Sequence, residues 1–106
     1  MQNAPPFYHW AALNASGRDE ERVLNALRKS RQMLGAMLEQ CQEQAELLGP
    51  VPLPVVKVSD RFRYRLQIRC RINRNIRQIL SSVLIACNKD KEMRDVSFYI
   101  ENEAGS

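Results

Sequence analysis

Residues 61–71, RFRYRLQIRCR, alternate strictly between apolar residues and residues that are basic or amide-bearing. This period of two predicts a β-strand with two different faces. The apolar face is expected to pack on a core and consists of Phe62, Tyr64, Leu66, Ile68 and Cys70. The opposite face carries Arg61, Arg63, Arg65, Gln67, Arg69 and Arg71. The strand therefore places a row of positive charge away from the core.

The remainder of the 106 residues predicts a single domain built from further strands and two helices. The helices are expected from Asp19 to about Gln42, with Ser16 as N-cap, and after Asn73, which is a suitable N-cap for the second. Strands are expected at 7–13, 46–49, 55–59 and 95–101. The order β-α-β-β-β-α-β indicates an α+β fold, with a mostly antiparallel sheet of four to five strands and both helices on one face.

The two predicted helices are amphipathic. Each carries one apolar stripe at helical spacing, and the rest of its surface is polar, as expected of helices that lie on a sheet. The stripes consist of Val23, Leu24, Leu27, Leu34, Leu38 and Cys41 in the first helix, and of Ile76, Ile79, Leu80, Val83 and Cys87 in the second.

The net charge of +4 is unevenly distributed along the chain. Residues 57–77 contain eight basic residues and one acid, so the excess is concentrated around the arginine strand. A local patch of this kind favours a polyanionic partner, and arginine suits phosphate because it can bind two oxygens at once. A solvated sheet face is the alternative interpretation, although such faces usually mix charges of both signs.

Exposed aromatic rings beside the arginines would form a surface on which unpaired bases stack. Tyr99 is expected on the arginine face if Phe98 is buried. For Trp10 the pattern leaves both faces open, because both phases of the first strand are apolar. Lys57, across the hairpin, would extend the basic surface. The predicted DNA-binding residues are Lys57, Arg61, Arg63, Arg65, Arg69, Arg71, Tyr99 and Trp10.

The sequence offers little for catalysis, metal binding or membrane insertion. It lacks G-x-x-x-x-G-K-[ST], G-x-G-x-x-G and H-E-x-x-H. One histidine, His9, and three cysteines without a C-x-x-C pair do not predict a zinc site, and buried free thiols in a reducing cytoplasm are expected. No apolar run approaches the roughly 18 residues of a membrane span, and no secretory signal is recognised.

Several segments carry a family resemblance. PPF opens a strand, SGRDEERV starts a long helix, and LLGPVPLPVVKVSDRFRYRLQIR leads into IRQILSSVLIA. Over residues 5–101, this order resembles the C-terminal domain of primosomal protein N′, the bacterial replication-restart helicase family written PriA. The chain departs from the family at its end, where IENEAGS replaces an acidic segment that contains proline.

The resemblance implies a domain excised from an ATP-dependent DNA helicase that works with other primosome proteins. The ATP, magnesium and zinc sites of the family lie in its other domains, so this fragment is expected to be no enzyme by itself. The resemblance also implies binding to single-stranded or forked DNA. It further implies contact with the acidic tail of the single-stranded-DNA-binding protein, through Arg74 or Arg77.

Two functions follow as alternatives. The chain is either mainly a DNA-binding module, through the arginine face, or mainly a docking module for an acidic peptide, with strand arginines packed against sibling domains. The sequence favours DNA binding as the main activity.

Overall fold

The computed structural model describes the backbone of residues 9–58, 60–71 and 74–102, and the side chains of 9–53, 60–71 and 74–101. Over this part of the chain, four strands and two α-helices follow in the order β-α-β-β-α-β, with a short 3-10 helix before the last strand. The elements are β1 (His9–Gly17), α1 (Glu20–Gln40), β2 (Ala45–Val58), β3 (Arg61–Cys70), α2 (Arg74–Lys89), η1 (Lys91–Met93) and β4 (Val96–Asn102).

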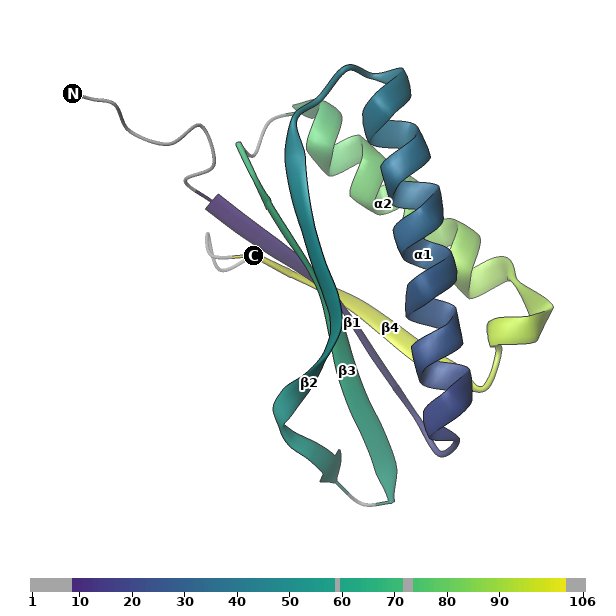
Figure 1. Ribbon diagram of the computed structural model, residues 1–106. Helices are drawn as coiled ribbons and strands as arrows, with labels where there is room; N and C mark the ends of the chain where they lie inside the picture. Colours follow the sequence, from purple (N-terminus) through teal and green to yellow (C-terminus); the bar gives the residue numbers. More distant parts are fainter. Residues whose placement is uncertain (1–8, 59, 72–73, 103–106) are drawn as a thin grey trace.

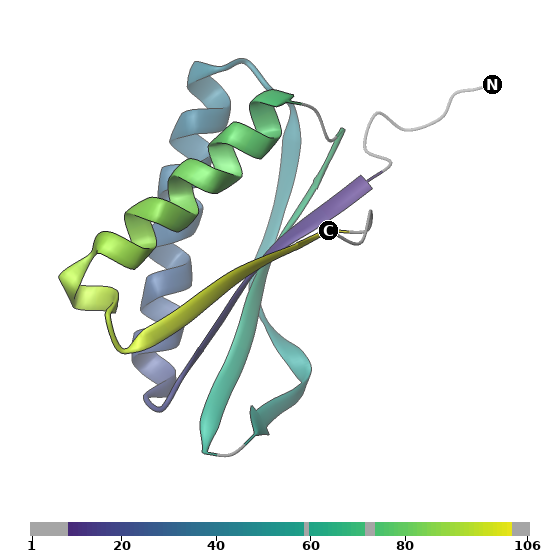
Figure 2. The same ribbon diagram turned by 180° about the vertical axis from the view of Figure 1, so that it is seen from behind.

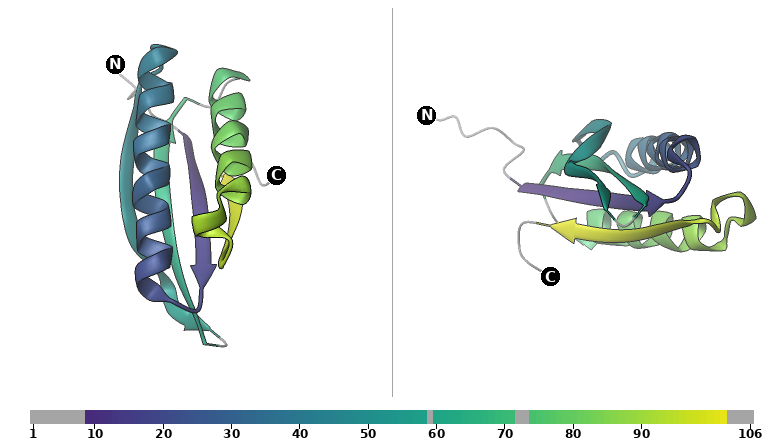
Figure 3. Two further views of the ribbon diagram at one scale, coloured as in Figure 1. Left: turned by 90° about the vertical axis from the view of Figure 1, so that its right-hand side faces the viewer. Right: turned by 90° about the horizontal axis from the view of Figure 1, so that it is seen from below.

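The strands form one antiparallel sheet in the order β2-β3-β1-β4. Both helices lie on the same face of this sheet (Figure 1, Figure 2). Figure 3 shows the two helices side by side in a layer of their own. The predicted α+β fold is therefore confirmed, with four strands. We call the other face of the sheet, which neither α1 nor α2 covers, the open face.

The hydrophobic core lies between the sheet and the two helices. β3 contributes Leu66, Ile68 and Cys70, each at most 1% exposed, and β1 contributes every second residue from Ala11 to Ala15. The prediction that the even-numbered side of β3 faces the helices is thus confirmed. The helices contribute Val23, Ala26, Leu27, Leu34 and Leu38 from α1, and Ile76, Ile79, Leu80, Val83 and Cys87 from α2.

β1 extends further along the chain than the sequence indicated. The predicted strand ends at Leu13, whereas β1 continues to Gly17, and residues 7 and 8 lie outside the described residues. Asn14, Ala15 and Ser16 pair with both β3 and β4, because β1 occupies the middle of the sheet. Two hydrogen-bonded ladders therefore override the low intrinsic strand preference of asparagine.

The N-cap of α1 is Asp19 and not the predicted Ser16. The Asp19 carboxylate accepts hydrogen bonds from the backbone N–H of Glu21 at 3.0 Å and of Arg22 at 3.3 Å. Ser16 still belongs to β1 at this point and is too early in the chain to cap the helix. Both residue types are good caps, so composition alone could not decide between them. Asn73, the predicted cap of α2, lies outside the described residues.

β2 is one continuous strand where the sequence predicts two short ones. It lies at an edge of the sheet, where proline is tolerated because the missing N–H has no partner to lose. Its pairing with β3 shifts register between Leu48 and Val51 and again between Pro52 and Lys57. With these irregularities the strand continues through its three prolines. The prolines therefore cause local bulges, whereas the sequence predicts a break between two strands.

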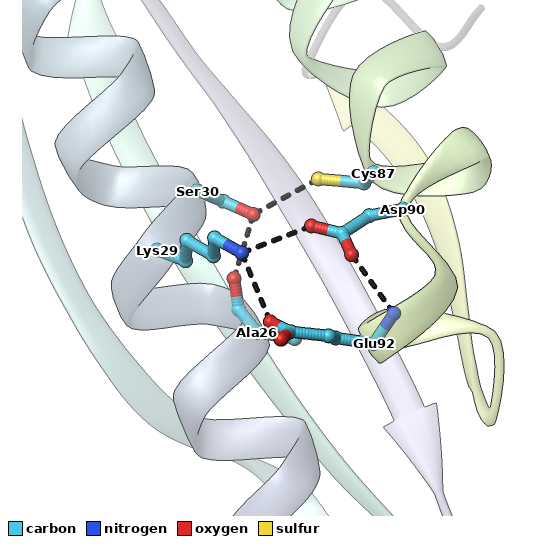
Figure 4. Close-up of polar contacts among 6 residues, drawn as sticks. All are labelled: Ala26, Lys29, Ser30, Cys87, Asp90 and Glu92. Atoms are coloured by element: carbon cyan, nitrogen blue, oxygen red, sulfur yellow. Dashed lines mark hydrogen bonds and ion pairs between the residues drawn. The ribbon is translucent and has the colours of Figure 1, made fainter.

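A polar cluster joins α1 to the segment between α2 and β4 (Figure 4). Lys29 Nζ lies 3.0 Å from Asp90 Oδ2 and 3.2 Å from Glu92 Oε1. Beside it, the buried Ser30 hydroxyl donates to a backbone carbonyl one turn earlier and lies 3.0 Å from Cys87 Sγ. Because the hydroxyl proton is already used, the Cys87 thiol is placed to donate to the serine oxygen. The cluster fixes the two helices relative to each other.

The three cysteines are free thiols with different surroundings. Cys70 and Cys87 are buried, as expected, and burial raises the pKa of Cys70 to about 11. Cys41 is exposed, so its predicted place on the buried stripe of α1 is wrong. The helix ends at Gln40, and Cys41 is its C-cap, ahead of the turn that leads into β2.

Candidate nucleic-acid interface

The β3 arginines lie on the open face, because the alternate positions of the strand, from Leu66 to Cys70, are buried against the helices. Arg63, Arg65 and Arg69 lie opposite even-numbered residues of β1, which also face away from the core. Arg69 is exposed, whereas the other two are half-buried. We call Arg61, Arg63, Arg65, Arg69 and Arg71 the arginine row.

Two carboxylates from neighbouring strands lie beside this row. Glu46 Oε1 in β2 is 3.8 Å from Arg69 Nη1, and Glu101 Oε1 in β4 is 3.8 Å from Arg65 Nη2. The sequence shows no acid within β3 itself, but the sheet order brings these two acids in from either side. Four arginines of β3 against two glutamates leave the open face positively charged, with part of its charge compensated internally, and Arg71 follows directly after the strand.

The other three arginines of the row form no ion pair among the described residues. Arg61 Nη2 donates to the Ser16 carbonyl at 3.1 Å and to Ser97 Oγ at 3.1 Å, which fixes its guanidinium beside β1 and β4. Within the described residues, Arg63 and Arg71 have neither an ion pair nor a side-chain hydrogen bond. These two are the members of the row most available to an external anion.

At the centre of the open face, Arg65 takes part in a compact cluster. Its guanidinium carbon lies 6.0 Å from the centroid of the Trp10 ring, within the range of a cation–π interaction. Asn14, only 1% exposed, donates from Nδ2 to Glu101 Oε1 at 3.0 Å. Asn14 Oδ1 and Arg65 Nε are buried without partners among the described residues. Hydrogen-bonding capacity therefore remains at the centre of the face.

Exposed apolar side chains accompany the arginines on the open face. Tyr99 is 49% exposed and lies opposite Asn14, while Leu48 and Val51 are each 38% exposed on β2. Trp10, whose face the sequence left open, is on this face and half-buried. Arginines interleaved with rings are typical of surfaces that bind unpaired nucleotides. Lys57, the last residue predicted for this surface, has a side chain outside the described residues.

The outer side of α2 forms a separate basic hollow of about 530 Å³. Arg74 and Arg77 are exposed and have no ion-pair partner in the described part of the chain. Ile85, at the other end of the hollow, is 53% exposed. The hollow thus combines two cations with an apolar side chain, and it is lined by Arg74, Arg77, Gln78, Ser81, Ser82 and Ile85.

A third group of arginines is not indicated by the sequence. Arg18, Arg22 and Arg94 meet Arg61 around a cavity of about 580 Å³ at one end of the sheet. The four come from the turn before α1, the first turn of α1, the start of β3 and the turn before β4. Because their proximity is created by the folded topology, no local pattern could have revealed it.

Among the described residues, no three His, Cys, Asp or Glu side chains gather as metal ligands do. The sequence also lacks the glycine-rich loop and lysine that hold nucleotide phosphates. No helix in the described part is long and apolar enough to span a membrane.

Solved structures share the fold at low sequence identity. The de novo designed protein Foldit4 is 12% identical with a TM-score of 0.58, covering 89% of this chain and 93% of the design. A hydantoinase/carbamoylase family amidase from Burkholderia ambifaria is 10% identical with a TM-score of 0.58, covering 92% of this chain and 28% of the amidase. At such identities, the likeness describes the architecture alone.

The fold and the open face define a small α+β domain with an arginine-rich sheet surface. A family profile for the primosomal protein N C-terminal domain matches residues 1–101. The chain belongs to this family. It is also 24% identical over 100 residues to the replication restart protein PriA of Bacillus subtilis (strain 168). The match covers 94% of this chain and 12% of that relative, so the chain corresponds to about an eighth of its length.

Proposed function

We propose that this domain binds single-stranded or forked DNA through the arginine row, as the C-terminal part of a replication-restart helicase. The row gives the phosphate backbone a line of cations on one sheet face, and Trp10 and Tyr99 offer rings beside it. The observation that carries the proposal is the pair Arg63 and Arg71, which have no acid within ion-pair distance among the described residues. The proposal assigns no catalytic step to this chain.

The form of the open face supports contact with a nucleic-acid strand. Phosphate contacts supply sequence-tolerant affinity, and stacking on aromatic rings adds about 1–3 kcal/mol per base. A face used only for solubility has no need of exposed rings or exposed aliphatic side chains. Here Tyr99, Leu48 and Val51 are exposed between the cations.

The first test is a titration of fluorescently labelled single-stranded DNA with the domain, in which fluorescence anisotropy reports binding. The titration is done at about 50 and at about 200 mM salt, because phosphate binding weakens steeply between these concentrations. The expected result is binding to all base compositions, with an association constant that falls strongly as salt rises. Absence of binding at the lower salt concentration would refute DNA binding by the isolated domain.

A second candidate function rests on the hollow of α2. We propose that Arg74 and Arg77 help dock the acidic tail of the single-stranded-DNA-binding protein, while the exposed Ile85 contacts an apolar side chain of that tail. Arginine binds carboxylates with paired hydrogen bonds, so two unpaired arginines one turn apart suit an acidic peptide. This role is compatible with DNA binding, because the hollow is on a helix and the arginine row is on the sheet.

The test of docking uses an acidic peptide with an apolar residue at its carboxyl end. Arg74→Gln/Arg77→Gln is expected to abolish peptide binding and leave DNA affinity unchanged, both in this domain and in the longer helicase. Arg28→Gln/Lys89→Gln removes the same charge elsewhere on the helices and serves as the control. Equal peptide binding by the two double variants would exclude the hollow as the docking site.

A further inference from the structure

One cavity gathers Arg18, Arg22, Arg61 and Arg94. Figure 1 shows that α1 and β4 begin at the same end of the sheet. The volume of the cavity, about 580 Å³, falls within the range of small-ligand sites. Its lining is strongly polar and comprises the four arginines with Asp19, Asp95 and Ser97. A space of this size accepts a phosphate together with the sugar that carries it.

The two acids of the cavity are already engaged. Asp19 caps α1 by accepting from the backbone N–H of Glu21 and Arg22, so the first amides of the helix are not available to a ligand. Asp95 Oδ2 accepts from Arg22 Nη1 at 2.9 Å. Arg22 therefore compensates Asp95 and also lies 3.9 Å from the Asp19 carboxylate. Four arginines against two acids leave the lining of the cavity with a net charge of +2.

The arginines other than Arg22 are of two kinds. Arg61 is held in place by the Ser16 carbonyl and Ser97 Oγ, each at 3.1 Å. Arg18 and Arg94 are exposed and, within the described residues, have neither an ion pair nor a side-chain hydrogen bond. Three guanidinium groups thus surround one space, one oriented and two able to turn toward a ligand. A net excess of cations around one space attracts an anion, and guanidinium groups match phosphate in geometry.

We propose that this cavity binds a phosphate group of the DNA strand that lies on the arginine row. Arg61 belongs to both the row and the cavity, so a strand that follows the row toward the start of β3 arrives at Arg18 and Arg94. The inference rests on the proposed DNA binding and extends its footprint around the end of the sheet. It gives a function to Arg18 and Arg94, which lie outside the sheet.

Pyrophosphate and DNA test the cavity separately. In NMR titrations, pyrophosphate is expected to shift the backbone amides of residues 17–18 and 94–97, and Arg18→Gln/Arg94→Gln is expected to abolish these shifts. The same variant should bind single-stranded DNA about 3- to 10-fold more weakly at low salt, with a shallower dependence on salt, because up to two phosphate contacts are lost. Arg28→Gln/Lys89→Gln, with an equal charge change on the helices, should behave as the wild-type domain.

The outcomes separate this inference from the proposed function. Pyrophosphate shifts that persist in Arg18→Gln/Arg94→Gln would overturn the cavity as a phosphate site, whether or not the domain binds DNA. Shifts that vanish in the variant while its DNA affinity is unchanged would mean that the cavity binds small phosphates and no strand, which overturns the inference but leaves the arginine row intact. A wild-type domain that binds pyrophosphate in the cavity but no DNA would overturn both the inference and the proposed DNA binding.

Discussion

At the scale of single residues, Arg65 shows how neighbouring side chains occupy a cation of the open face. Its guanidinium is shared between the Trp10 ring and the Glu101 carboxylate, and Glu101 is in turn bound by Asn14. Any phosphate that reaches Arg65 must compete with Glu101 for the same cation. Under the proposed DNA binding, we expect the carboxylate to act as an internal competitor and to lower affinity for DNA.

Replacing Glu101 with glutamine is expected to strengthen DNA binding. Glutamine keeps an oxygen that can accept from Asn14, while the loss of its charge frees Arg65 for a phosphate. We expect affinity for single-stranded DNA to rise about 2- to 10-fold at low salt, with the gain disappearing at high salt. Anisotropy titrations at both salt concentrations measure the effect.

Glu39→Gln provides the matched control for this variant, because Glu39 is exposed on α1, on the other side of the sheet. Equal affinities of Glu101→Gln and Glu39→Gln would show that only net charge matters and that Arg65 takes no part in binding.

The residue patterns that could be predicted from the sequence are those fixed by local spacing. Alternation in 61–71 correctly placed Leu66 and Ile68 in the core and the arginines opposite them. The partners of those arginines could not be predicted, because Glu46 and Glu101 reach them only through the order of strands in the sheet. Trp10 was undetermined for a related reason, since both phases of its strand are apolar.

At the scale of elements, the β2–β3 hairpin depends on a glycine. Gly49 has a φ of +116°, and a Cβ at this position would lie 2.8 Å from the carbonyl oxygen of Arg65. No other residue type adopts this conformation readily or fits against the neighbouring strand. The prolines suggested a break in this region, and the structure instead has a bulged continuous strand around Gly49.

Two alanine substitutions test this account of the hairpin. Gly49→Ala should destabilise the domain by more than about 1 kcal/mol, because both its φ and its surroundings exclude a side chain. Gly35→Ala, in the middle of α1 where a Cβ meets nothing within 4 Å, should stabilise it by about 0.4–1 kcal/mol. Urea unfolding of both variants measures the change in the free energy of unfolding. An unchanged free energy of unfolding in Gly49→Ala would contradict the proposed constraint at Gly49.

The contact between α1 and the segment before β4 should make stability depend on pH. The backbone N–H of Glu92, and then Lys29, hold the pKa of Asp90 below its ordinary value. A carboxyl whose pKa is lowered by folding stabilises the domain above its unfolded pKa, and this stabilisation is lost as pH falls through the lowered folded pKa.

Asp90→Asn is the corresponding variant, since asparagine can still cap η1 but cannot pair with Lys29 as an ion. Its melting temperature should be lower than that of the wild type near neutral pH. The two melting temperatures should converge in acid, once the pH falls below the lowered pKa of Asp90 and the wild-type carboxyl is also protonated. A difference in melting temperature that stays constant with pH would show that the ion pair does not contribute.

At the scale of the whole molecule, the two layers separate structural and binding roles. The helices cover one face of the sheet (Figure 3). The arginines of β3 lie on the other face. The helix order, the α+β class and the family were accessible from the sequence, because they depend on spacing and motif order. The cavity of Arg18 and Arg94 could not be predicted from the sequence, because it forms where separate segments of the chain meet in the folded domain.

The central claim is that the arginine row holds the phosphates of a DNA strand, and one comparison tests it most directly. Within the described residues, Arg63 and Arg71 have no ion pair or side-chain hydrogen bond to lose, so Arg63→Gln/Arg71→Gln should leave the fold unaffected. Against labelled single-stranded DNA, the slope of log K against log salt should become shallower by about 1.4, at about 0.7 per lost phosphate contact, while Arg28→Gln/Lys89→Gln keeps the wild-type slope. If both double variants keep the wild-type slope and affinity, the arginine row does not bind DNA.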